Sequence, residues 1–351
     1  MLTLDGISRL ELDREDMFGH IRSLGTELVR AWERSESLEL PPGADRAKGV
    51  VIAGMGGSAT AADYFAAICN VSSERPVVVS RGYTLPNWVD GDTLVVISSY
   101  SGNTEELIAS YDDAWKRGAM ILAVTRGGKI GARADADGVP VYPIDYVAQP
   151  RAALAHSLAP LLRLGLILGI TGVADAEVRD AGASHRALVE SEFEPGVPEQ
   201  RNPAKQTARA LLRRFPLVLG AEHLAPVASR YKNQVAENGK SLAAADILPE
   251  ANHNLIVGLA TAADVADTLS LVTLESALYH ERTSLRFDLT TKYFAEAGIP
   301  VHRHQVGGEG LLAQLLLGTA WGDYVSAYLA LLNDQDPSPV PQIDRLKAEL
   351  G

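Results

Sequence analysis

The sequence has very little cysteine. Cys69 is the single cysteine among 351 residues, so no disulfide can form within the chain. Thiols without a partner are typical of proteins in reducing compartments, where disulfides do not persist. We expect Cys69 to be a core residue, and the chain to work in the cytoplasm.

Positive charge is also scarce. The chain has 32 Lys and Arg residues against 44 Asp and Glu residues, a net charge of −12, and no basic run offsets this locally. Nucleic acids and anionic membrane surfaces attract clustered Lys and Arg, so we expect neither as a partner. A phosphate-binding pocket on this chain must therefore be local, built from loops and a few cations.

Long apolar runs are missing as well. No apolar stretch without charge reaches the ~18 residues that a membrane-spanning helix needs. Residues 1–5 do not show a basic region followed by an apolar run, so we expect no secretory signal. The length predicts a large core divided into about two domains, and the composition predicts a soluble protein.

The chain does contain a buried strand that ends in glycines. Residues 50–53 are apolar, and Gly54, Gly56 and Gly57 then permit a tight turn with close approach of the backbone to a ligand. Ser58 follows where a helix begins, so backbone N–H groups and the helix dipole would converge on a phosphate. The spacing is neither GxGxxG nor a nucleotide loop with lysine, and a glycine-rich turn without a ligand is the alternative.

A second loop of this kind follows another strand, over residues 98–106. Five of the seven residues from 98 to 104 carry hydroxyl groups. Ser99, Ser101 and Thr104 could each donate to a phosphate oxygen, while the helix that opens near Asn103 adds backbone donors. The alternative is a helix cap with Thr104 or Ser101 as the N-cap, and one helix end can serve both purposes.

Strands and helices alternate along the chain, which predicts an α/β protein with two doubly wound parallel sheets. The expected strands are residues 49–53, 76–80, 94–99, 119–124 and 139–143, then 216–221, 267–274 and 301–306. The expected helices are an amphipathic one within 10–40, then 104–116, 152–168, 175–192, 224–241, 289–297 and 309–332, and residues 255–259 form a short apolar run. No close sequence repeat relates the two halves, so an internal duplication rests on element order alone.

Six spaced motifs carry a resemblance to a known family. They are GMGGSA at 54–59, SSYSGNTEE at 98–106, QPRAAL at 149–154, KNQVAENGK at 232–240, PEANHN at 249–254 and WGDYVS at 321–326. Together and in this order, they resemble the bifunctional phosphoglucose/phosphomannose isomerases, which are built from two sugar isomerase (SIS) domains. The resemblance implies Rossmann-like or flavodoxin-like domains with helical flanks.

On this resemblance the chain divides into five parts. They are an N-terminal helical flank (1–40), a first SIS domain (41–151), a helical bridge and linker (152–198), a second SIS domain (199–335) and a C-terminal tail helix (336–351).

The resemblance also implies a set of site residues. Those expected to bind the substrate phosphate are Gly56, Gly57, Ser58, Ser99, Ser101 and Thr104. Those expected to be catalytic are Glu237 as base, Arg151 as stabiliser of the enediolate, and His253 and Lys347 as groups that assist ring opening. The family's active site lies between its two domains, near a dimer interface.

The chemistry requires residues of these types. Aldose–ketose isomerisation moves a proton between C1 and C2 through a cis-enediol, so one carboxylate such as Glu237 can remove and return it. A fixed guanidinium such as Arg151 stabilises the charge that develops on oxygen, and His253 titrates in the range that ring opening needs. Each residue also has an ordinary interpretation: Glu237 as a surface acid paired with Lys240, His253 as a loop histidine, and Arg151 and Lys347 as solvated cations.

The expected partner is a small phosphosugar, and no cofactor or metal is implied. The histidines show no ligand set, and we expect His302 and His304 to flank a strand rather than to bind a metal. The resemblance implies a homodimer with a shared active site in which His253 comes from the partner subunit. The apolar helices expected at 152–168 and 309–332 favour a dimer, with internal core as the alternative.

The family often has an acid where this chain has Leu255 and an alanine where it has Gly239, and residues 144–148 differ from its usual turn. These departures bear on substrate range. A non-catalytic phosphosugar-binding or regulatory SIS protein is the competing function, because the same hydroxyl loops would serve it.

Overall fold

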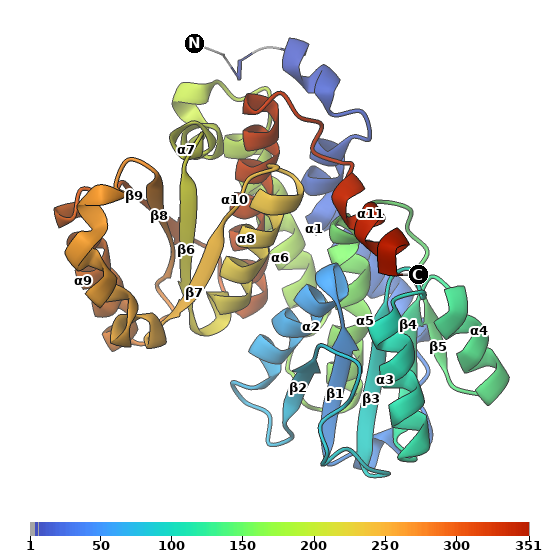
Figure 1. Ribbon diagram of the computed structural model, residues 1–351. Helices are drawn as coiled ribbons and strands as arrows, with labels where there is room; N and C mark the ends of the chain where they lie inside the picture. The colour runs from blue at the N-terminus through green and yellow to red at the C-terminus, as the bar shows by residue number, and fades with distance from the viewer. Residues whose placement is uncertain (1–3, 6, 351) are drawn as a thin grey trace. The chain divides into compact units, whose positions relative to one another are not determined.

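The computed structural model describes residues 4–5 and 7–350, which form two compact units (Figure 1). The first unit is Leu24–Ala183, and the second consists of the described parts of Met1–Ser23 and Ser184–Gly351. The boundaries between the units fall inside two helices, α1 (Met17–Arg34) and α6 (Asp175–Leu188). The predicted domain limits at 41–151 and 199–335 stay predictions.

The first unit has a five-stranded parallel sheet with strand order β2-β1-β3-β4-β5. Its strands are β1 (Gly49–Gly54), β2 (Val77–Ser80), β3 (Thr93–Ser99), β4 (Met120–Thr125) and β5 (Val141–Pro143). Every residue of β1 and β3 is buried, as expected for apolar strands covered on both faces. Both strands lie inside the sheet, and their carboxyl ends carry the two predicted phosphate loops.

Helices cover both faces of this sheet (Figure 1). One face carries α2 (Gly56–Cys69) and α5 (Leu154–Ile167), which follows a short 3-10 turn, η4 (Pro150–Ala153). The other face carries α3 (Glu105–Lys116) and α4 (Gly128–Asp137). Cys69 is buried at the end of α2, where burial raises the pKa of its thiol to about 12, so its prediction as a core residue is confirmed.

The second unit has a four-stranded parallel sheet with strand order β7-β6-β8-β9. Its strands are β6 (Phe215–Ala221), β7 (Ala244–Leu248), β8 (Leu269–Ser276) and β9 (Val301–Val306). Helices α7 (Pro203–Leu211), α8 (Ala225–Glu237) and α10 (Leu311–Leu332) pack together beside it, and α9 (Glu281–Glu296) contacts β8. A last helix, α11 (Pro341–Leu350), has no buried residue.

The predicted fold class, α/β with two doubly wound parallel sheets, is confirmed, but several element predictions were wrong. Helix α9 begins at Glu281 rather than near 289, and residues 255–259, expected only as a short apolar run, belong to a 3-10 helix, η9 (Leu255–Asp264). The early turns of α9 were missed because they are polar. Strand β7 was not predicted because it is a short, half-buried edge strand, and α4 and α7 were also missed.

Helix α10 is long and apolar enough to cross a membrane by length and composition, and 94% of the window that meets this test is buried inside the structure. It packs against α7 and α8 within the second unit. Asp323 of α10 accepts two hydrogen bonds from Arg230 of α8, at 3.1 and 2.7 Å, and both side chains are buried. Helix α10 is therefore internal core, the alternative that the sequence left open, and the homodimer stays a prediction.

A buried histidine lies in the same core. His304 of β9 stacks on Trp321 of α10 with ring centroids 3.9 Å apart, and its Nε2 atom lies 3.4 Å from the hydroxyl of Tyr231. Burial lowers the pKa of His304 to about 3, and the nearby His302 lowers it further. The folded protein therefore keeps this ring neutral at pH values where the unfolded chain protonates it.

This histidine should make the protein sensitive to acid. Because the pKa of His304 is lower in the folded state, its contribution to stability is fully present above pH 6.5 and is lost as the pH falls. We expect a loss of about 2 kcal/mol in the free energy of unfolding at pH 5. His304→Phe keeps an aromatic ring and removes the proton site, so urea unfolding across this range should show a flatter pH dependence. Parallel curves for the two proteins would contradict this assignment.

Candidate functional site

The two predicted phosphate loops lie side by side in the first unit. They follow β1 and β3, which are adjacent parallel strands with Gly54 opposite Ser98. With strand order 2-1-3-4-5, the chain reverses direction across the sheet between these two strands, and ligands of such folds bind outside the carboxyl ends at this point. The order of the strands therefore places both loops at the expected binding position.

The loop after β3 is held in shape by its own hydroxyl groups. The N–H of Gly102 donates to Ser99 Oγ at 3.2 Å, the N–H of Asn103 donates to Ser101 Oγ at 3.2 Å, and Ser99 Oγ donates to Thr104 Oγ1 at 3.3 Å. Helix α3 begins at Glu105, and the Thr104 side chain makes no capping hydrogen bond. The three predicted hydroxyls thus occupy one short loop before a helix N-terminus.

Glycine is required where this loop meets its neighbour. Gly102 has φ = 70°, and a Cβ atom there would lie 1.8 Å from the carbonyl oxygen of Gly127 in the turn after β4. The N–H of Ile130, in turn, donates to the carbonyl of Gly102 at 2.9 Å. The loop therefore packs tightly against the start of α4. This contact limits how far the hydroxyl groups of the loop can move.

The loop after β1 approaches the segment that carries Arg151. Gly56 has φ = 52°, and helix α2 begins there rather than at Ser58 as predicted. A Cβ atom on Gly57 would lie 2.8 Å from the carbonyl oxygen of Pro150 and 3.3 Å from the Cα atom of Arg151. Arg151 is buried, so its interpretation as a surface cation was wrong. The structure thus brings Arg151 to the first phosphate loop.

Tyr100 joins the other loop to the same segment, a role that the sequence analysis missed. Its hydroxyl lies 2.8 Å from the carbonyl oxygen of Tyr146 and 3.0 Å from that of Ala148, and it accepts from the N–H of Ala148 at 3.0 Å. Tyr100 is buried, although it stands within a polar motif. The signal for this role in the sequence was an aromatic residue placed among four residues that carry hydroxyl groups. Tyr100 therefore links residues 98–104 to the residues just before Pro150.

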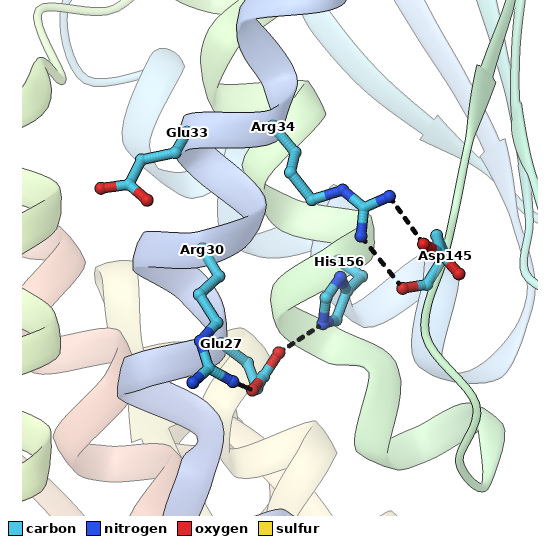
Figure 2. A pocket seen from close by; sticks show the side chains of 6 residues that line it. All are labelled: Glu27, Arg30, Glu33, Arg34, Asp145 and His156. Carbon is cyan, nitrogen blue, oxygen red and sulfur yellow. Dashed lines mark hydrogen bonds and ion pairs between the residues drawn. The ribbon is translucent and has the colours of Figure 1, made fainter.

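A separate surface cavity of about 520 Å³ lies in the first unit and contains none of the predicted site residues (Figure 2). It is lined by Glu27, Arg30, Glu33, Arg34, Asp145 and His156. Glu27 contacts both Arg30 and His156, at 2.7 and 3.1 Å, and Arg34 pairs with Asp145 at 2.8 Å. Burial lowers the pKa of His156, an effect that Glu27 opposes. Five of these side chains pair with one another, and Glu33 pairs with Arg179 at 2.9 Å, which favours a structural role.

The remaining predicted residues belong to the second unit. Glu237 is the last residue of α8 and is half-buried, His253 ends a 3-10 turn (Glu250–His253) and is exposed, and Lys347 lies exposed on α11. They therefore occupy three separate elements. The described residues contain no group of three or more His, Cys, Asp or Glu residues that could hold a metal ion.

Lys240 ties the turn after Glu237 to the segment before α11. Its ammonium group donates to the carbonyl oxygens of Glu237, Pro337 and Pro339, the last two at 3.0 and 2.7 Å. Lys240 itself has φ = 52°, a left-handed conformation that is uncommon for residues other than glycine. The backbone that carries Glu237 is thereby fixed to the start of the C-terminal segment.

Comparisons with known proteins give a separate family match in each of the two units. Residues 45–137 match the SIS domain family, and residues 200–350 match the bacterial phospho-glucose isomerase C-terminal SIS domain. A bifunctional phosphoglucose/phosphomannose isomerase from Caldicellulosiruptor bescii is 37% identical over 95% of this chain and 99% of its own length. A second one, from Aquifex aeolicus, is 34% identical over 86% of this chain and 90% of its own.

The chain belongs to the bifunctional phosphoglucose/phosphomannose isomerase family. It is therefore an enzyme of the isomerase class. Among solved structures, tagatose-6-phosphate ketose/aldose isomerase from Escherichia coli matches with a TM-score of 0.68 at 14% identity, over 92% of this chain and 94% of that one. At this identity the match confirms the fold alone.

The bonds of Tyr100 can be tested by removing its hydroxyl. Tyr100→Phe keeps the ring but leaves the partly buried N–H of Ala148 without its acceptor, so we expect a loss of about 1 kcal/mol in the free energy of unfolding. Because residues 98–104 are then free to shift, affinity for inorganic phosphate should also fall several-fold. Urea unfolding and calorimetry measure the two effects.

Tyr83→Phe is the matched control, since Tyr83 is exposed and its hydroxyl bonds to Glu105, the first residue of α3, rather than to residues 146–148. We expect its stability and phosphate affinity to stay close to those of the native protein. Unchanged phosphate affinity in Tyr100→Phe would show that this hydroxyl does not position the loop.

Proposed function

We propose that the protein interconverts glucose 6-phosphate and/or mannose 6-phosphate with fructose 6-phosphate, through a cis-enediol and without a cofactor. The observation that supports this most directly is the first unit's own geometry. Two hydroxyl-rich loops end adjacent strands at the binding edge of the sheet, and Arg151 lies against one of them. The names of the two relatives described above point to the same substrates.

In this proposal the first unit binds the phosphate. Ser58, Ser99, Ser101 and Thr104 donate to its oxygens, and the glycines at 56 and 57 allow the backbone to approach. Neutral donors and a helix N-terminus suit an acidic protein, since they hold a dianion without a lysine cluster. The phosphate then fixes the position of the sugar relative to Arg151.

The proton transfer is assigned to Glu237. Its carboxylate removes the proton from C2 of the open-chain aldose, and electrons move to form the enediolate. The same carboxylate, now protonated, returns the proton to C1, while the proton of the C2 hydroxyl passes to the C1 oxygen and the carbonyl forms at C2. The buried guanidinium of Arg151 stabilises the negative charge on the oxygens during this step. His253 and Lys347 assist ring opening by moving a proton between the ring oxygen and the C1 hydroxyl.

The competing function is that of a non-catalytic phosphosugar-binding protein. Such a protein would use the same loops but would not need Glu237 as a base. Turnover therefore separates the two. Glu237→Gln keeps the size of the side chain and removes the base, so we expect binding of fructose 6-phosphate to persist while kcat falls by about 10²–10⁴-fold. Calorimetry and a coupled assay with chelator present measure these separately.

The double variant Ser101→Ala with Thr104→Ala is the matched comparison, because it should weaken sugar-phosphate binding and leave the base in place. A Glu237→Gln protein that keeps more than about a tenth of the native rate would exclude Glu237 as the base. An unchanged affinity in the double variant would mean that these hydroxyls do not bind the phosphate.

We further propose a homodimer in which His253 of one subunit completes the site of the other, and a cytoplasmic location. Both stay predictions. The dimer can be tested by mixing Glu237→Gln protein with His253→Ala protein under conditions that exchange subunits. A shared site restores one intact pocket in each mixed dimer, so about a quarter of native activity should return at equal mixing. If exchange is demonstrated and no activity returns, each chain supplies its own histidine.

A further inference from the structure

The turn that carries His253 is anchored to the second unit by two of its other residues. It is the short 3-10 turn η8 (Glu250–His253), which follows the edge strand β7. Ala251 is fully buried and Asn252 is half-buried, whereas His253 and Asn254 are exposed. The turn therefore has an inner side that packs on the second unit and an outer side that carries the histidine.

The side chain of Asn252 joins this turn to helix α9. Its amide nitrogen donates to Oγ1 of Thr290 at 2.8 Å, and its amide oxygen accepts from the guanidinium of Arg286 at 3.2 Å. Arg286 and Thr290 are four residues apart on α9, so both contacts come from one face of the helix. Because Thr290 is only 1% exposed, the turn is attached to a buried position in the helix.

The chemistry of the three side chains fixes the orientation of the amide. A guanidinium can only donate, so the amide oxygen must face Arg286 and the amide nitrogen must face the threonine hydroxyl. Main-chain bonds close the turn as well, since the N–H of Asn252 donates to the carbonyl of Pro249 at 3.0 Å. An amide held at both ends, on a closed turn, leaves the backbone of the next residue, His253, little freedom.

We propose that Asn252 is a positioning residue that holds His253 in place for ring opening. This role rests on the proposed function, in which His253 assists that step. A proton can be transferred only when the imidazole lies within hydrogen-bond reach of the sugar oxygens, and an exposed histidine on an unanchored loop would sample many other positions. The two bonds of Asn252 to α9 restrict the histidine before the substrate binds.

The first variant removes both bonds. Asn252→Leu keeps the branched shape of the side chain, and we expect kcat for fructose 6-phosphate to fall by about 10²-fold while affinity changes little, because a displacement of about 1 Å can cost that much. Asn252→Asp should keep most of the native rate, since a carboxylate accepts from Arg286 and the threonine hydroxyl can turn to donate. A coupled assay and calorimetry measure rate and affinity.

The same substitution in His253→Ala protein separates positioning from a merely structural role. If Asn252 acts through His253, Asn252→Leu should change kcat by less than about twofold once the histidine is gone. An equal fall in both backgrounds would overturn the inference, since the asparagine would then act on another group. Native turnover in His253→Ala protein is a different failure, because it would overturn the role of the histidine in the proposed function and the inference with it.

A second pair of variants reaches the same contact from α9 and covers failure of Asn252→Leu to fold. Thr290→Val keeps the shape of the side chain and removes the hydroxyl to which Asn252 bonds. Thr291→Val is the matched control, since Thr291 is also buried but its hydroxyl bonds to the carbonyl oxygens of Phe287 and Asp288 within α9, at 2.9 and 3.1 Å.

We expect Thr290→Val to lower kcat several-fold and Thr291→Val to leave it near the native value, and melting curves check that both variants fold. Equal kcat values in the two variants would overturn the inference, because the bond between the turn and α9 would then have no effect on the reaction.

Discussion

The candidate site depends on one close contact between two backbones. Gly57 lies so near Pro150 that no side chain larger than hydrogen fits without displacing it. This contact sets Arg151 beside the loop after β1, and Tyr100 fixes the preceding residues to the loop after β3. Three segments distant in sequence are thus held together by main-chain packing and one phenol. A phosphate bound by the loops would be held at a defined position relative to the backbone of Arg151.

The turn around Glu237 is held with similar firmness in the second unit. Asn238 donates to Ser326 at 3.0 Å, and Asn333 donates to the carbonyl of Gly239 at 2.9 Å. A Cβ atom on Gly239 would lie 2.7 Å from the carbonyl oxygen of Val235. The glycine at this departure from the family pattern therefore fits a tightly packed end of α8. A proposed base on a fixed turn moves little between the two carbons that it must reach.

Other motif residues serve packing rather than chemistry. Within the WGDYVS motif, Trp321 stacks on His304, and Asp323 forms the buried pair with Arg230. Removing one partner of such a pair leaves a buried charge without compensation, which is strongly destabilising. Recurrence of a charged residue in a motif therefore does not by itself assign it to the active site. The motif is explained by the core between α8 and α10.

The sequence by itself determined the fold class and carried the resemblance to the family. The apolar strands, their alternation with helices and the hydroxyl-rich loops of 98–104 are local patterns, and the structure confirmed the two parallel sheets that they predict. Local sequence patterns did not predict those elements whose formation depends on contacts with other parts of the chain. The edge strand β7 has no clear period of its own, and the polar start of α9 gave no apolar stripe.

Only the tertiary structure decided what lies next to each loop. Burial of Arg151, the bonds of Tyr100 to residues 146 and 148, and the three carbonyls around Lys240 all join segments whose separation no periodicity records. Residue types set which chemistry was possible, and long-range packing set where it could occur.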